Sequence, residues 1–219
     1  MNNLRKIFDS VTHSSDKWEP YFEIYEKHLS FLRGRNINFV EVGVQKGGSL
    51  EMWSTFFGPQ AKITGIDVDE DCRNLQYQQN NIQVVIGNQE STSFWKSFVE
   101  NNPPIDVLVD DGGHTMSQQI TTFESVFPHM PVGSIYICED CHTSYMPYSG
   151  GGLENPNSFI EYAKTYVDVL HYDYKDKFST RLENRNSIAK NLSGLYFYDS
   201  VVIFEKFGKR RMTRVFPKL

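Results

Sequence analysis

Cysteine and long apolar runs are both scarce in this sequence. The three cysteines, Cys72, Cys138 and Cys141, are an odd and low number, and the first ten residues include no apolar stretch with a small-residue cleavage site. No run approaches the roughly 20 apolar residues that span a bilayer. We therefore expect a cytoplasmic protein, in a reducing compartment, with no membrane among its partners.

Positive charge is also in short supply over most of the chain. The 219 residues include 22 basic and 27 acidic side chains, and six of the basic ones lie from Lys206 onward, where no acid occurs. The preceding part is therefore strongly acidic, which makes it a poor binder of a nucleic-acid backbone. We expect no nucleic-acid partner, a basic C-terminal end that is either solvated or an oligomer contact, and a homo-oligomer.

Short runs rich in Val and Ile alternate with amphipathic stretches, the pattern of an α/β sheet covered on both faces. Strands are expected at residues 38–44, 62–68, 82–87, 105–110, 134–139, 194–198 and 201–205. Helices are expected up to residues 30–35 and over 49–57, 91–101, 117–127 and 156–170, with Ser49 as an N-cap. Asp199 and Ser200 join the last two strands into an antiparallel hairpin. The pattern predicts a doubly wound, mostly parallel sheet.

Glycines and an acid follow the first two strands, where a doubly wound sheet binds its ligands. The first strand runs into Glu41-Val-Gly43-Val-Gln-Lys-Gly47-Gly48-Ser49, and the second ends in Asp67. Glycines let a ligand approach the backbone closely, and an acid after the second strand commonly binds ribose hydroxyls. The turn is neither a Walker A loop nor G-x-G-x-x-G. The pattern indicates a nucleoside cofactor with few phosphates; the alternative is glycines that only make a tight turn.

Acidic residues follow the fourth and fifth strands, which are neighbours about 4.8 Å apart in such a sheet. Asp111 follows one, and Glu139 and Asp140 follow the other. Three converging carboxylates repel one another unless a cation joins them, and oxygen ligands select a hard ion, Mg²⁺ ahead of Mn²⁺ or Ca²⁺. His114 lies three residues past Asp111 and is a candidate general base. The alternative is a set of unrelated surface acids with a structural histidine.

Two further motifs do not fit their usual functions. Cys138-Glu-Asp-Cys141-His142 has the spacing of a haem c attachment site, but covalent attachment normally requires export, and no second C-x-x-C completes a zinc site. Asn102-Pro-Pro-Ile105 is similar to the N-P-P-aromatic motif of amino-directed DNA methyltransferases. It precedes the fourth strand, however, and has Ile in place of the aromatic residue.

Six segments together carry a resemblance to a known family: Ser15-Asp-Lys17, the run from Glu41 to Trp53, Gly65-Ile-Asp67, Asp110-Asp-Gly-Gly-His114, Glu139-Asp-Cys-His-Thr-Ser-Tyr145 and residues 195–206. They resemble class I S-adenosylmethionine-dependent methyltransferases. More closely, the chain is similar to the metal-dependent macrocin and mycinamicin sugar O-methyltransferases and to the rhamnosyl O-methyltransferase, or cephalosporin hydroxylase-like, group. The paired acidic motifs are specific, whereas the glycine turn is general to the superfamily.

The resemblance implies a seven-stranded Rossmann-like sheet and a role for each matching residue. The divalent metal would be held by Asp111, Glu139 and Asp140, with His114 as the catalytic base. S-adenosyl-L-methionine would lie against Glu41, Gly43, Gly47, Gly48, Ser49, Asp67, Asn88, Gln89 and Asp110. The acceptor would contact Asp16, Lys17, His142 and Tyr145. Asn88 stands where the family usually has Asp.

The expected organisation is one methyltransferase domain over residues 1–219: a helical cap at 1–36, a cofactor and metal half at 37–140, and an acceptor loop, helix and hairpin at 141–219. The expected reaction is methylation of a sugar hydroxyl, on a nucleotide-activated or a glycoside-linked sugar. Three alternatives stay open. They are a catechol-type O-methyltransferase, a non-haem iron oxygenase that uses His114, His142 and one acid, and a non-catalytic nucleoside-binding module.

Overall fold

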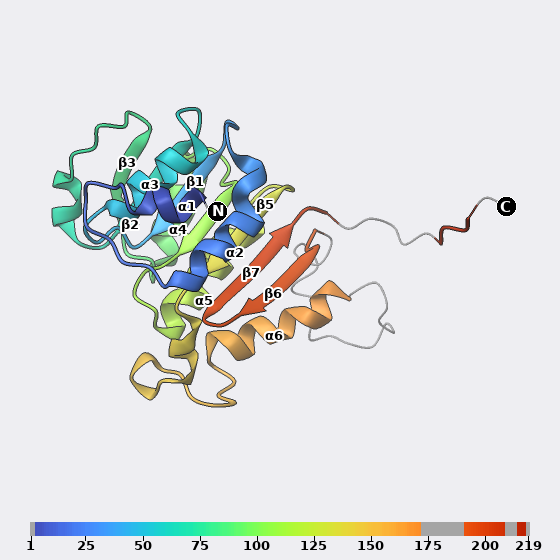
Figure 1. Ribbon diagram of the computed structural model, residues 1–219. Helices are drawn as coiled ribbons and strands as arrows, with labels where there is room; N and C mark the ends of the chain where they lie inside the picture. The colour runs from blue at the N-terminus through green and yellow to red at the C-terminus, as the bar shows by residue number, and fades with distance from the viewer. Residues whose placement is uncertain (1–2, 172–190, 209–213, 218–219) are drawn as a thin grey trace.

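A seven-stranded sheet forms the centre of the computed structural model, which describes residues 3–171, 191–208 and 214–217 (Figure 1). Its strands are β1 (Asn38–Val42), β2 (Lys62–Asp67), β3 (Ile82–Ile86), β4 (Val107–Asp110), β5 (Ser134–Cys138), β6 (Gly194–Tyr198) and β7 (Val201–Lys206). They lie in the order β3-β2-β1-β4-β5-β7-β6. The first five pair in parallel, and β7 is antiparallel to both of its neighbours. The expected mostly parallel sheet with a C-terminal hairpin is confirmed.

The register of the central strands brings their carboxyl ends to one edge. Val42 pairs with both Ile66 and Asp110, and Asp110 pairs with Cys138. Every residue of β4 and β5 is buried, as expected for parallel strands covered on both faces. The polar residues that follow β1, β2, β4 and β5 are therefore held side by side at a rigid edge.

Helices cover both faces of the sheet. They are α1 (Asn3–Phe8), α2 (Glu19–Leu29), α3 (Gly48–Phe57), α4 (Thr92–Asn101), α5 (Met116–Val126) and α6 (Phe159–Leu170). Short 3-10 turns lie at η1 (Ser30–Leu32), η2 (Glu70–Asn74), η3 (Phe127–His129), η4 (Cys141–Tyr145) and η5 (Pro147–Ser149). One hydrophobic core joins the sheet to α4, α5 and α6, and a second joins it to α1, α2 and α3. This arrangement is doubly wound.

The start of α3 differs from the sequence prediction. The N-cap is Gly47, at a φ of 89°, and not Ser49, whose hydroxyl instead donates to the Glu41 carboxylate at 2.6 Å. Gly48 packs so closely under the preceding segment that a Cβ there would lie 2.4 Å from the His13 carbonyl oxygen. Glycine at the helix start therefore admits the N-terminal segment onto α3.

The basic C-terminal end also differs from expectation at its first residue. Lys206 is buried in β7, and its ammonium donates to the carbonyl oxygens of Phe127, Pro128 and Met130, so it fixes η3. Burial lowers the pKa of Lys206. Arg214 is exposed, as expected for a solvated end, and the remaining four basic residues, Lys209, Arg210, Arg211 and Lys218, lie outside the described residues. Within the described ranges, no helix combines the length and apolar character needed to cross a membrane.

Candidate active site

A cavity of about 380 Å³ opens at the carboxyl edge of the parallel strands. Its lining comes mainly from the ends of β1 and β2, the turns after β3, β4 and β5, and the segment before α2. Eleven of the predicted site residues line it: Asp16, Lys17, Gly43, Ser49, Asp67, Asn88, Gln89, Asp111, His114, Glu139 and Asp140. The structure therefore brings most of the predicted cofactor and metal residues to one place.

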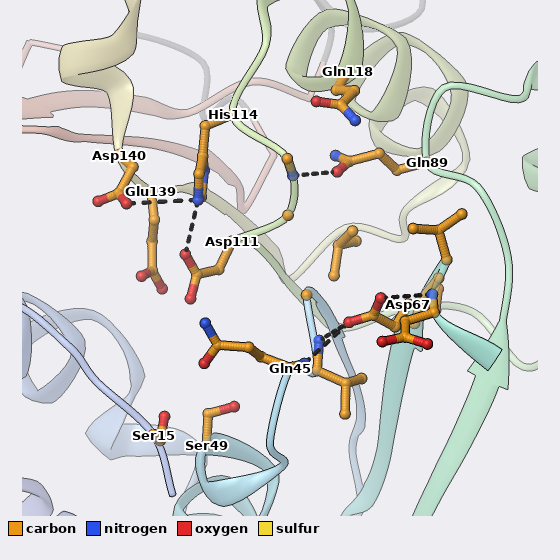
Figure 2. A pocket seen from close by; sticks show the side chains of 18 of the residues that line it. Ser15, Gln45, Ser49, Asp67, Gln89, Asp111, His114, Gln118, Glu139 and Asp140 are labelled. Carbon is orange, nitrogen blue, oxygen red and sulfur yellow. Dashed lines mark hydrogen bonds and ion pairs between the residues drawn. The ribbon is translucent and has the colours of Figure 1, made fainter. Parts of the chain in front are cut away.

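The glycine turn and Asp67 form one end of this cavity (Figure 2). Gly43 has a φ of 92°, and a Cβ there would lie 2.0 Å from the Asp111 carbonyl oxygen, so only glycine fits. The Asp67 carboxylate accepts the backbone N–H of Val44 at 2.8 Å, Gln45 at 3.0 Å and Asp69 at 2.9 Å. Burial raises the pKa of Asp67, but these donors outweigh it and hold the pKa below its usual value. The turn is thus pinned around an ionised carboxylate.

Asp111, His114 and Asp140 meet at the other end (Figure 2). Among the described residues, each offers one ligand atom, and these atoms lie within 4.8 Å of one another. His114 Nε2 is 3.8 Å from Asp111 Oδ1 and 3.6 Å from Asp140 Oδ2. His114 Nδ1 is buried, with no hydrogen-bond partner in the described part of the chain. A buried polar atom in this condition indicates a partner that the protein does not itself provide.

A sharp turn separates the two acids after β5. The strand ends at Cys138, and Asp140 adopts a left-handed φ of 51°, so Glu139 and Asp140 point to different places. Asp140 joins His114, while Glu139 is 1% exposed and accepts hydrogen bonds from Lys17 at 2.9 Å and from the Tyr25 hydroxyl. Burial first, and the nearby Asp111 second, raise the pKa of Glu139 to about 8, although Lys17 acts in the opposite direction.

Lys17 lies inside the acidic cluster and not at its rim. Its side chain is 2% exposed, and its ammonium contacts Asp111, Glu139 at 2.9 Å and Glu41 at 3.5 Å. Burial lowers the pKa of Lys17, but the three carboxylates outweigh it and raise the pKa well above its ordinary value. The structure thus shows this predicted acceptor contact as an internal counter-charge for three acids.

The segment of residues 12–18, which we call the N-terminal strap, carries Lys17 over the start of α3. It is fixed by the buried Glu51 carboxylate, which accepts the Thr12 N–H at 2.6 Å, the Thr12 hydroxyl at 2.7 Å and the His13 N–H at 3.2 Å. His13 Nδ1 also lies 2.8 Å from Glu51. Four contacts on one carboxylate hold the strap against the cavity, where Asp16 and Trp18 form part of the wall.

Gln89 supports the loop that carries His114. Its side-chain oxygen accepts the Gly113 N–H at 2.7 Å (Figure 2). Its amide nitrogen donates to Asp110 at 2.9 Å and to Thr122 at 3.2 Å. Asp110 accepts a second bond, at 3.0 Å, from the Tyr136 hydroxyl. This buried network ties the loop after β4 to the sheet, so the predicted adenine-side residue Gln89 also acts as a loop support.

Asp110 makes stability depend on pH. Burial raises its pKa to about 7, whereas an unfolded Asp has a pKa near 3.9. The folded state therefore binds more protons, and the contribution of Asp110 to stability falls as pH rises from about 4 to 7. We expect the free energy of unfolding of Asp110→Asn, relative to that of the parent protein, to rise by about 1.4 kcal/mol per pH unit across this window. Urea unfolding at several pH values measures the difference, with the exposed Asp168→Asn as control. A difference that does not vary with pH contradicts this titration.

Six predicted residues do not line the cavity. Glu41 is fully buried and is held by Ser49, by Trp53 Nε1 at 3.0 Å and by Lys17. The others are Gly47, Gly48 and Asp110, which are buried, and His142 and Tyr145, which line a separate pocket beside the β6–β7 hairpin. Buried partners already satisfy Glu41 and Asp110, so their side chains act on the site through neighbouring residues.

The sequence analysis missed three aromatic residues at the site. The Tyr21 hydroxyl donates to Asp140 at 2.7 Å, Tyr25 donates to Glu139, and Trp18 lines the cavity with 61% of its surface exposed. Tyr21 and Tyr25 lie one helical turn apart on the buried face of α2. The sequence offered one signal of their role at the site: each of these two buried positions carries a hydroxyl group, which an apolar helix face does not require.

Comparisons with known proteins agree with this geometry. The sequence model of a methyltransferase domain matches residues 40–141, which run from within β1 to just past the end of β5. A solved structure of the MycE methyltransferase of mycinamycin biosynthesis, in complex with Mg and SAH, superimposes with a TM-score of 0.79 at 25% identity. The match covers 94% of this chain and 54% of that one. The fold is therefore the one that this methyltransferase structure has.

Curated relatives indicate which kind of methyltransferase the chain is similar to. The Streptomyces olivaceus 8-demethyl-8-(2-methoxy-alpha-L-rhamnosyl)-tetracenomycin-C 3'-O-methyltransferase is 30% identical, over 90% of this chain and 52% of that protein. The Micromonospora griseorubida mycinamicin VI 2''-O-methyltransferase is 28% identical, over 83% of this chain and 47% of that protein. The chain thus spans about half the length of the curated relatives it matches. It is a homologue of sugar O-methyltransferases.

Proposed function

We propose that this protein transfers a methyl group from S-adenosyl-L-methionine to a sugar hydroxyl and that the reaction requires a divalent cation, preferably Mg²⁺. One observation carries the proposal. A cavity has a pinned glycine turn with an ionised Asp67 at one end and the cluster of Asp111, His114 and Asp140 at the other. The relatives named above are sugar O-methyltransferases, which supports the choice of acceptor.

The residues present fit both groups. Gly43 leaves room at the turn, and the carboxylate of Asp67 is positioned at the end of β2, where an acid binds ribose hydroxyls. Asp111 and Asp140 supply oxygen donors at the open end, and such donors suit Mg²⁺. Glu139 lies beside Asp111 as the third proposed ligand, and its carboxylate reaches a cation only by exchanging its contact with Lys17.

The roles of the chain's own residues follow from their positions. The bound groups would supply an electrophilic methyl sulfonium and a lowered pKa of the acceptor hydroxyl. His114 would take the hydroxyl proton at Nε2, the atom that faces Asp111 and Asp140. Gln89 would keep the loop of His114 in place through Gly113. Most of the rate gain would come from holding two substrates in line, because a methyl transfer needs little further covalent help.

The metal requirement is tested by chelation. We expect EDTA to lower the rate of methyl transfer to a sugar acceptor by at least about 100-fold, and added Mg²⁺ to restore it, because the hydroxyl then regains its activating cation. Labelled S-adenosylmethionine with a panel of methyl glycosides measures the transfer, and equilibrium binding of the cofactor in EDTA is the control. Undiminished transfer in EDTA contradicts the metal role.

The same assay separates the alternatives. Transfer to catechols and not to sugars would identify the catechol-type enzyme, and tight cofactor binding without transfer would identify a nucleoside-binding module. The iron oxygenase would need His142 beside His114. In the structure His142 Nδ1 instead lies 2.5 Å from the Ser200 hydroxyl, and His142 is not among the clustered ligand atoms. The geometry therefore favours methyl transfer.

A further inference from the structure

The motif Cys138-Glu-Asp-Cys141 has no role in the proposed methyl transfer, yet its two cysteines enclose two of the proposed metal ligands, Glu139 and Asp140. Cys138 is the last residue of β5, and Cys141 is the first residue of η4. Both thiols are free, and within the described ranges neither belongs to the cluster of candidate ligand atoms. The pair is therefore available for thiol chemistry.

The two thiols lie together inside this turn. The Cys141 thiol donates to the Cys138 carbonyl oxygen at 3.3 Å, and each of the two thiols lies 3.8 Å from the Glu139 carbonyl oxygen. They are also within hydrogen-bond reach of each other. The chain folds back here because Asp140 has a left-handed φ of 51°. A C-x-x-C pair that is folded in this way is the arrangement of reversible dithiols.

A cavity of about 430 Å³ gives one of these thiols a route to small molecules. We call it the hairpin pocket because η4, α6 and the β6–β7 hairpin all contribute to its lining, which includes Cys141, Tyr145 and Phe197. Tyr145 is 50% exposed and Phe197 is 42% exposed, so the cavity reaches the surface beside them. Cys141 is 1% exposed and lies at the floor, whereas Cys138 is fully buried and does not line the pocket. A reagent in the hairpin pocket therefore meets Cys141 first.

The third cysteine provides a contrast within the same chain. Cys72 lies in η2, where its thiol donates to the Gln45 carbonyl oxygen at 3.5 Å. It is also buried, but it does not line the hairpin pocket. Burial alone is thus common to all three thiols, and what sets the other two apart is their pairing and the cavity beside them.

We propose that Cys138 and Cys141 form a redox-active dithiol, which a small disulfide that enters the hairpin pocket oxidises to an intramolecular disulfide. The Cys141 thiolate attacks one sulfur of the small disulfide, so its S–S bond breaks and one small thiol leaves. The Cys138 thiolate then attacks the Cys141 sulfur and releases the second small thiol. The protein pair is oxidised, the small disulfide is reduced, and the two thiol protons end on the two released thiols.

The disulfide alters the turn that carries Glu139 and Asp140. Bonded sulfurs lie about 2.05 Å apart, much closer than two unbonded thiols. Both ends of the turn are held, because the Glu139 N–H donates to the Asp110 carbonyl oxygen and the Cys141 N–H to the Ser200 carbonyl oxygen, each at 2.9 Å. The shift therefore falls on Asp140 between them. This consequence rests on the proposed function, and it means that oxidation weakens the divalent-cation site.

The test counts thiols and measures metal affinity on the same samples. The full chain is reduced, freed of reductant and incubated with 2-hydroxyethyl disulfide, then denatured and alkylated with N-ethylmaleimide for mass spectrometry. We expect the number of alkylated cysteines to fall from three to one and dithiothreitol to restore all three. In calorimetric titrations of the native samples, the affinity for Mn²⁺ should fall at least about tenfold on oxidation and recover after reduction and removal of the reductant.

Three variants locate the reaction. Cys138→Ala should stop at the mixed disulfide on Cys141, seen as one added mercaptoethanol, and Cys141→Ala should not react. Cys72→Ala is the matched control, because it removes a buried thiol outside the pair and should still form the disulfide. Peptide mapping of the oxidised parent protein identifies the bonded cysteines independently of any variant. The proposal is overturned if the parent keeps three free thiols or if the reagent attaches to Cys72.

The two readouts separate this inference from the proposed function. Tight Mn²⁺ binding by a protein that keeps three free thiols would support the metal site and overturn the dithiol. A disulfide that forms between Cys138 and Cys141 and leaves Mn²⁺ affinity unchanged would overturn its control of the metal site. Formation of the disulfide in a protein whose reduced form binds no divalent cation would support the dithiol and overturn the metal role in the proposed function.

Discussion

Replacing His114 with alanine is expected to lower kcat for methyl transfer by at least about 100-fold, the usual contribution of a positioned general base. The reason is geometric, because Nε2 of His114 faces both acids of the cluster and no other described imidazole belongs to it. Affinity for S-adenosylmethionine should stay unchanged, since Asp67 and the glycine turn lie at the opposite end of the cavity. Added imidazole should restore part of kcat, as it can occupy the space left by the side chain.

The control for this prediction is His129→Ala, which removes an exposed histidine in η3 and should keep full activity. Binding of Mn²⁺ distinguishes the two roles open to His114, which is close enough to both acids to act as a ligand. Loss of Mn²⁺ affinity together with a failure of imidazole to restore activity would contradict the assignment of His114 as the base and make it a ligand.

The parts of the fold that the sequence predicts well are those set by local pattern. The strands were expected within two residues of their observed ends, because runs such as Val107–Asp110 are apolar up to their last residue and have proline or glycine nearby on either side. The hairpin follows from two short apolar runs joined by Asp199 and Ser200. Parallel pairing then brings Asp111 near Asp140, which is why the cavity could be predicted from strand ends alone.

The roles of individual site residues were harder to predict because they depend on distant contacts. Lys17 meets Asp111 and Glu139 across 94 and 122 residues of sequence, and no local pattern reports such a contact. Glu41 has the sequence position of a ligand-binding acid, yet it faces Ser49 and Trp53 inside the fold. The side to which an acid points after a strand ends is decided by single backbone angles, as Asp140 shows.

Lys17→Met is the second change from which we expect a large effect, and it tests the balance of charge in the cluster. Methionine keeps the length of the buried stem but removes the ammonium that contacts Asp111, Glu139 and Glu41. Without divalent ions, loss of one partner from a buried ionic cluster is expected to cost about 3 kcal/mol of stability. For a chain of this size that corresponds to a fall in Tm of about 6–12 °C, measurable by calorimetry in EDTA.

Metal binding should change in the opposite direction. The ammonium of Lys17 both occupies Asp111 and Glu139 and repels a nearby cation, so its removal is expected to raise the affinity for Mn²⁺ at least about tenfold, and saturating Mn²⁺ should recover most of the lost Tm. Lys206→Met is the matched control, because it also removes a buried ammonium, but one bonded to backbone carbonyl oxygens and not to acids. It should lower Tm without changing the affinity for Mn²⁺. If Lys17→Met instead weakens Mn²⁺ binding, then Lys17 aligns the carboxylates for the cation and does not compete with it.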